Sequence, residues 1–166
     1  MSHQPQLISD PFEFARRGDT LTGELDARSL PRLAGMLRDL GEEQKLRFEL
    51  SGSRIGDKSF LDVLATASLV LPCQRCLGDV SRVVEVESRL LLVPRDEALP
   101  DEGLEEDDFD PVHAGRDFDV FEAVEEELLL ALPLAPTHDD CSVPAAGKSG
   151  DESSPFAVLR GLKSRE

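Results

Sequence analysis

Two long stretches in which apolar and polar residues alternate dominate the sequence. They lie within residues 60–93 and are separated by five residues, Pro72-Cys73-Gln74-Arg75-Cys76. The alternating apolar positions are Leu61, Val63, Ala65, Ala67, Leu69 and Leu71 in the first stretch and Val80, Val84, Val86, Leu90 and Leu92 in the second. A period of two residues indicates β-strands, and the short connection predicts an antiparallel hairpin with a Cys-x-x-Cys pair at its tip.

Shorter segments predict two more strands and a first helix. Residues 20–25 and 45–54 alternate in the same way as the hairpin. Between them, residues 29–40 have helical spacing, with Ser29 as the expected N-cap, Pro31 in the first turn and Gly41 as the stop. The apolar positions of this predicted helix are Leu30, Leu33, Ala34, Leu37 and Leu40.

A second helix is predicted over residues 119–132. Asp119 and Glu122 have the spacing of a capping box, and Pro133 disfavours continuation of the helix. The expected buried face consists of Val120, Phe121, Val124, Leu128, Ala131 and Leu132, and the side chains expected in water are Glu122, Glu125 and Glu126. This order of elements predicts an α+β fold, a mostly antiparallel sheet with a long hairpin packed against two helices.

Flanking segments are expected on both sides of a single domain that spans residues 19–143. Residues 1–18 are expected to form an extended arm, because Pro5 and Pro11 disfavour a continuous helix. Within the domain, residues 94–117 are expected to form an acidic loop without regular structure. Residues 144–166 predict a polar linker followed by a short amphipathic helix over residues 155–163.

Composition favours a globular protein whose core is built from small aliphatic side chains. Apolar residues make up 40% of the 166 residues, and Trp and Tyr are absent. No apolar run approaches the roughly 18 residues of a membrane helix, and the first residues lack the pattern of a signal peptide. We therefore expect a cytoplasmic protein that has no membrane partner.

The net charge of −16 is unevenly distributed. Residues 95–127 contain fifteen acidic residues and two arginines, so the remainder of the chain is close to neutral. Nonspecific affinity for nucleic acids comes mostly from basic residues that displace counterions. The composition therefore predicts either a small local contact with RNA or a contact through a basic partner protein.

The three cysteines, an odd number with two of them in a Cys-x-x-Cys pair, fit reduced thiols or a metal site better than a disulfide framework. A tetrahedral zinc ion could be bound by three thiols and one imidazole, those of Cys73, Cys76, Cys141 and His138. The two halves of this ligand set are more than sixty residues apart in sequence. One alternative is a redox-active dithiol, which a hairpin tip disfavours because it lacks a helix N-terminus. The other is that Cys73 and Cys76 are reduced turn residues that serve packing or contact with a partner. No nucleophile elbow and no phosphate-binding glycine loop is present, so we expect no enzymatic activity.

Three blocks of the sequence resemble a known family. The Cys-Gln-Arg-Cys segment is followed by Leu-Leu-Leu-Ala-Leu-Pro-Leu-Ala-Pro-Thr-His at residues 128–138 and by Pro-Phe-Ala-Val-Leu-Arg-Gly-Leu-Lys at residues 155–163. Together they resemble the bacterial YceD family of large ribosomal RNA subunit accumulation proteins. The resemblance implies a non-enzymatic, cytoplasmic factor for synthesis, processing or stability of 23S ribosomal RNA, with the pre-ribosomal large subunit or its rRNA as partner.

The resemblance leaves two mechanisms open. In one, the hairpin tip contacts RNA through Arg75, with Arg82 and Lys58 nearby. In the other, the acidic loop binds a basic ribosomal protein until that protein is placed on the RNA. A competing function is a small zinc-binding adaptor without a direct role at RNA.

Overall fold

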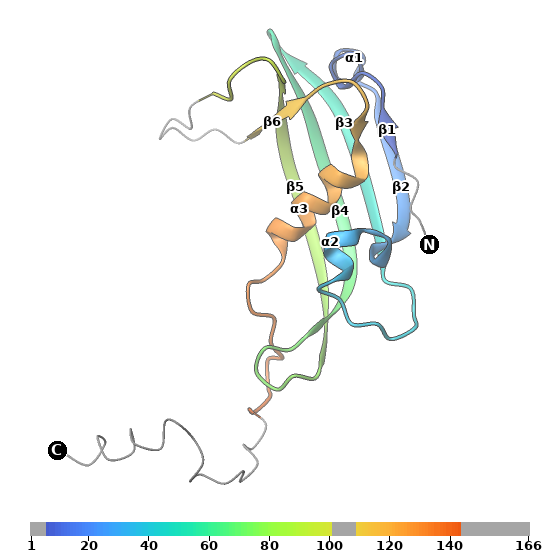
Figure 1. The fold of residues 1–166 in the computed structure, drawn as a ribbon, viewed down its shortest axis with the longest axis vertical. Helices are drawn as coiled ribbons and strands as arrows, with labels where there is room; N and C mark the ends of the chain where they lie inside the picture. Colours follow the sequence, from blue (N-terminus) through green and yellow to red (C-terminus); the bar gives the residue numbers. More distant parts are fainter. Residues whose placement is uncertain (1–5, 101–108, 144–166) are drawn as a thin grey trace, which may run out of the picture.

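The computed structural model describes residues 6–100 and 109–143, and its centre is a five-stranded sheet of order β2-β3-β4-β5-β6. The strands are β2 (Thr20–Asp26), β3 (Lys45–Ile55), β4 (Lys58–Pro72), β5 (Asp79–Pro94) and β6 (Asp110–Ala114). All neighbours are antiparallel except β5 and β6. Figure 1 shows the helices α2 (Pro31–Ala34) and α3 (Val120–Ala131) in front of these strands. The predicted α+β class is confirmed.

The long hairpin of β4 and β5 organises the sheet, as the alternation predicts. Its register pairs Ser59 with Leu92 at one end and Pro72 with Asp79 at the other. The apolar positions of one parity face the helices and form the core, because the side chains of a strand point alternately to its two faces. The side chains of the opposite parity lie on the other face of the sheet, which α2 and α3 leave open.

Helix α3 begins where the capping pattern predicts. The Asp119 carboxylate accepts hydrogen bonds from the backbone N–H groups of Phe121 (2.9 Å) and Glu122 (3.3 Å). The expectation that Glu125 faces water is wrong, because its side chain is buried and accepts hydrogen bonds from the backbone of Arg32 (2.7 Å) and Leu33 (2.9 Å). Glu125 thus caps the first turn of α2, which has no cap from its own N-cap residue, Leu30.

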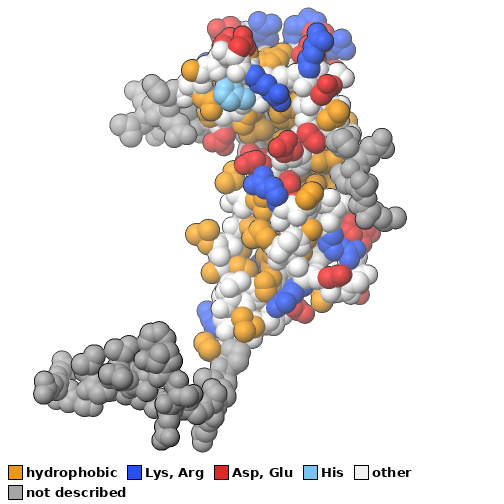
Figure 2. Space-filling view, in the orientation of Figure 1, with side chains coloured by type: hydrophobic (Ala, Val, Ile, Leu, Met, Phe, Trp, Pro, Cys, Tyr) orange, Lys and Arg blue, Asp and Glu red, His pale blue; other side chains and the backbone are white. Residues whose placement is uncertain are grey.

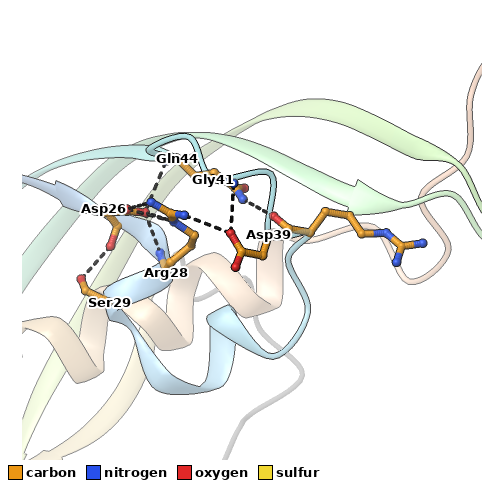
Figure 3. Close-up of polar contacts among 7 residues, drawn as sticks. Asp26, Arg28, Ser29, Asp39, Gly41 and Gln44 are labelled. Carbon is orange, nitrogen blue, oxygen red and sulfur yellow. Dashed lines mark hydrogen bonds and ion pairs between the residues drawn. The ribbon is translucent and has the colours of Figure 1, made fainter. Parts of the chain in front are cut away.

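The predicted helix over residues 29–40 is only partly present. A 3₁₀ turn η1 (Ala27–Ser29) is followed by α2, and Gly35 is its C-cap. Figure 3 shows the polar contacts in this region: Asp26 pairs with Arg28 and accepts from the N–H of Gln44, and Gln44 donates to the carbonyl of Arg38. Because the N–H of Arg38 is bonded to the carbonyl of Val70 in β4, the chain leaves the helical path.

The N-terminal region is more ordered than expected. Residues 1–5 lie outside the described residues, but Pro11–Arg17 form the helix α1, so the expected extended conformation is wrong there. Pro11 occupies the first turn, where proline favours helix formation, and Asp10 accepts a hydrogen bond from the N–H of Glu13. Before α1, the strand β1 (Leu7–Ile8) pairs with β7 (Phe118–Asp119).

The acidic segment is also partly regular. Residues 110–114 form β6 parallel to β5, and Ala114 is buried, so the prediction of an irregular loop is wrong for this part. The alternation of Val112 and Ala114 beside an apolar strand explains the pairing. Residues 101–108 and the helix predicted over residues 155–163 lie outside the described residues. Among the described helices, none has the length and apolarity required to cross a membrane.

Candidate metal centre

Two distant segments meet at the tip of the hairpin. After α3 the chain runs along the sheet to the β4–β5 turn, as Figure 1 shows. The N–H of Gln74 donates to the carbonyl of Pro136 (2.8 Å), and the guanidinium of Arg82 donates to the carbonyl of Thr137. These bonds hold residues 136–141 against the turn, so His138 and Cys141 lie beside the Cys-x-x-Cys pair.

The candidate ligand atoms of Cys73, Cys76, His138 and Cys141 all lie within 4.8 Å of one another. The sulfurs of Cys73 and Cys141 are 3.7 Å apart, and Cys76 Sγ is 3.3 Å from His138 Nδ1. With zinc–sulfur bonds of about 2.3 Å and zinc–nitrogen bonds of about 2.0 Å, tetrahedral geometry requires edges of about 3.8 Å and 3.5 Å. The donor set and these two edges therefore fit a zinc ion.

The turn itself prepares Cys73 as a thiolate. Leu77 adopts a left-handed conformation with φ of 64°, and the N–H of Cys73 donates to the carbonyl of Gly78 (2.7 Å), so the turn curls around the sulfur. Burial opposes ionisation of the Cys73 thiol, but hydrogen bonds from the backbone N–H groups of Cys76 and Arg75, each 3.4 Å from its sulfur, lower its pKa to about 5. A thiolate is the form that binds a metal.

The orientation of His138 leaves one ring nitrogen available. Its Nε2 lies 2.8 Å from the carbonyl of Asp79, which can only accept a hydrogen bond, so the proton resides on Nε2 and the lone pair of Nδ1 faces the sulfurs. Such an outer contact is the usual way in which a metal-binding histidine is fixed. The Asp79 carbonyl, followed by the Cys73 sulfur, raises the pKa of the imidazole. For Cys141, burial and the two neighbouring thiols raise the pKa of the thiol.

The structure separates the three predicted contact residues. Arg75 and Arg82 lie at the tip, where Arg75 donates to the carbonyl of Cys141 (3.3 Å). Lys58 begins β4 at the opposite end of the hairpin, with its ammonium 5.1 Å from the centre of the Phe109 ring. Contact of any of these residues with RNA stays a prediction, and the structure groups only two of them.

One arginine at the tip was not predicted from the sequence. Arg38 donates to the carbonyl of Leu77 (2.9 Å) and pairs with Asp79 (3.1 Å). It lies more than thirty residues from the turn in sequence, within a segment expected to be helical, so local pattern gave no signal for it. Because Arg82 also pairs with Asp139 (3.8 Å), two of the three arginines at the tip are matched by carboxylates.

Comparison with known proteins assigns the family. No solved structure matches the chain significantly. The family model described as large ribosomal RNA subunit accumulation protein YceD matches residues 61–163. This range is more than half of the chain and contains α3, all four candidate ligands and all but the first three residues of the β4–β5 hairpin. The chain therefore belongs to the YceD family of large ribosomal RNA subunit accumulation proteins.

Proposed function

We propose that this protein is a non-enzymatic assembly factor that supports accumulation of 23S ribosomal RNA in the cytoplasm, acting on the pre-ribosomal large subunit. The observation that carries the proposal is the family match over residues 61–163. In this proposal, the ionisable and thiol side chains of the described residues serve recognition and structure. The buried carboxylate of Glu125 caps a helix, and the thiols converge on a candidate metal position.

Zinc at Cys73, Cys76, His138 and Cys141 is part of the proposal. The ion would tie the hairpin tip to residues 136–141, adding to the hydrogen bonds of Gln74 and Arg82. In a structural zinc site the protein supplies all four ligands and leaves no position for a substrate, and these four residues would make such a set. The centre would therefore present a rigid surface rather than a reactive metal.

A basic ribosomal protein is the proposed partner of the acidic segment, residues 95–117. This segment is strongly negative, whereas the arginines at the tip are largely engaged within the chain: Arg38 and Arg82 pair with carboxylates, and Arg75 donates to the carbonyl of Cys141. The partial neutralisation of the tip supports a protein partner over broad contact with RNA, whose binding depends on unmatched basic residues. Opposite charge would accelerate and select the encounter.

A sucrose-gradient profile tests this function. The protein should sediment with precursors of the large subunit in cell extract, and deletion of its gene should lower the ratio of 23S to 16S rRNA. A capture experiment in rising salt after nuclease treatment should retain a basic ribosomal protein. Neutralising the acidic residues of 95–117 should release that protein. Absence from all ribosomal fractions together with unchanged rRNA would contradict the proposal.

The second candidate, a zinc-binding adaptor without a role at RNA, is favoured only by the clustering of the four ligands. It predicts that the protein binds zinc, is absent from ribosomal fractions and leaves rRNA levels unchanged when deleted. The same gradient thus distinguishes the two functions.

A further inference from the structure

The face of the sheet opposite α2 and α3 carries an ordered set of carboxylates. Two rows of directly opposed residues cross β2, β3, β4 and β5. The first row is Thr22, Glu49, Leu64 and Glu87, and the second row is Glu24, Arg47, Thr66 and Glu85. These eight residues, which we call the open face, line a shallow hollow of about 950 Å³.

The negative charge of the open face is not neutralised from within. Arg47 pairs with Glu24 at 2.6 Å. In the adjacent row, Arg89 pairs with Asp62 at 2.5 Å. Within residues 6–100 and 109–143, no cation pairs with Glu49, Glu85 or Glu87. These three carboxylates surround Leu64, whose side chain is 44% exposed, so the open face combines negative charge with an apolar centre.

The outer edge of β5 provides a second, independent feature. In the described structure, β6 pairs with β5 only from Leu90 to Pro94. Glu85 and Glu87 therefore lie on a stretch of β5 that has a strand partner, β4, on one side only. An open strand edge offers backbone N–H and C=O groups that an extended peptide can pair with, and RNA cannot reproduce that pairing.

We propose that the open face docks an extended polypeptide segment rich in lysine and arginine, which adds alongside β5. Alternate side chains of an added strand point to one face of the sheet, so basic residues at every second position would face Glu85 and Glu87 on the neighbouring strand. Glu49, two strands further into the sheet, would add to the negative potential of the face. The side chains between them would point to the other face. The identification of the segment as part of a large-subunit ribosomal protein rests on the proposed function. The docking itself does not rest on it.

A neighbouring hollow supports a polypeptide as the occupant. Beside the open face, the exposed side chains of Leu40 and Val83 line a second hollow of about 380 Å³ with Ser68, Val70 and Ser81. Aliphatic stems of lysine and arginine cover such surfaces while their charged ends reach carboxylates. A nucleic acid would instead bring its negatively charged phosphates toward glutamates that no cation of the described residues neutralises.

Fluorescence anisotropy with a defined probe tests the docking. The probe is a labelled synthetic peptide of twelve residues with lysine or arginine at alternate positions and threonine or valine between them. We expect it to bind the full-length protein, and the triple variant Glu49→Gln, Glu85→Gln, Glu87→Gln to bind at least tenfold more weakly. The matched control Asp57→Asn, Glu122→Gln, Glu126→Gln makes the same change in net charge at exposed positions outside both the open face and residues 95–117, and it should change the affinity less than twofold.

Two further measurements separate docking from bulk charge attraction. A peptide of the same sequence with alternate backbone N–H groups methylated, so that it cannot pair with β5, should bind at least fivefold more weakly. Equal weakening by the two triple variants, or undiminished binding of the methylated peptide, would overturn the proposal. So would an RNA oligonucleotide that binds the protein and displaces the peptide. Loss of peptide binding only on neutralising residues 95–117 would reject this docking while leaving the proposed function intact.

Discussion

Burial gives individual glutamates of α3 different roles. Glu126 is exposed and pairs with Arg32 at 3.3 Å, whereas Glu125, one residue earlier, is only 5% exposed and accepts two backbone hydrogen bonds. Glu127 is also buried, and burial, with a smaller effect from the nearby Asp110 and Glu126, raises the pKa of its carboxyl. These residues are neighbours in sequence, but they contribute differently to stability.

Replacing Glu125 by alanine should destabilise the protein. The substitution leaves the backbone N–H groups of Arg32 and Leu33 without their acceptor. Buried donors without partners cost about 1–3 kcal/mol, and we expect a loss of that size in the free energy of unfolding measured with urea. Glu126→Ala is the control and should change it by about 0.5 kcal/mol or less. Equal losses in both variants would show that Glu125 does not cap α2.

Replacing Glu127 by glutamine should stabilise the protein in a pH-dependent way. Because the folded state raises the pKa of this carboxyl, it retains the proton more strongly than the unfolded chain does, and its ionisation lowers stability as the pH rises. Glu127→Gln should therefore be more stable than the parent at pH 7 to 8. The two should converge below about pH 4, where the carboxyl is protonated in both states. Urea unfolding between about pH 4 and pH 8 measures the difference in stability between the variant and the parent, and this difference should grow as the pH rises.

At the scale of elements, close packing fixes α1 on the sheet. Gly52 of β3 lies so near α1 that an added Cβ would be 2.6 Å from Ala15 Cα and 2.7 Å from the carbonyl oxygen of Phe14. Both are backbone atoms, so the helix would have to move. The order of the N-terminal region therefore depends on a residue more than thirty positions away in sequence.

Gly52→Ala should displace α1 and destabilise the fold. Overpacking of this kind costs about 1–3 kcal/mol, which urea unfolding would detect. Faster hydrogen exchange at the amides of residues 12–17 would identify the displaced element. Gly35→Ala is the matched control, because its Cβ would make only an ordinary contact of 3.5 Å with the carbonyl of Arg32. A Gly52→Ala protein with unchanged stability and exchange would refute this account of the packing.

At the scale of the whole molecule, the chain closes on itself at the hairpin tip. The candidate ligands come from β4–β5 and from the segment that follows α3, so the centre joins parts of the chain that are more than sixty residues apart. Figure 2 shows, on the helix side, acidic and basic side chains intermixed over the body of the protein. On the opposite side, the open face carries the unmatched carboxylates that we propose as a docking surface.

Zinc should bind at about one ion per chain, and Cys76→Ser should bind less than a tenth of that amount. Removing one of the four ligands lowers the affinity for zinc and loosens the attachment of residues 136–141 to the hairpin tip. Elemental analysis of untagged protein measures the metal, and hydrogen exchange at the amide of Gln74, which is bonded to Pro136, reports this attachment. Ser142→Ala is the neighbouring control. Metal-free parent protein with a protected Gln74 amide would refute a zinc-dependent attachment.

The sequence alone determined the hairpin, the strands β2 and β3, the start and end of α3, and the family. These features follow from period-two alternation, a capping residue and a proline, which are local signals. Alternation also placed Cys73 and Cys76 in one turn.

Tertiary structure decided the features that depend on contacts between distant residues. The length of α2, the burial of Glu125, the docking of α1 and the pairing of β6 each require a partner that local sequence does not specify. The approach of His138 and Cys141 to the turn was a hypothesis from residue types, and the folded chain brings their donor atoms within reach of one another because residues 136–141 bond to the hairpin. The open face likewise exists only after four strands are placed in register, because its carboxylates come from three separate strands.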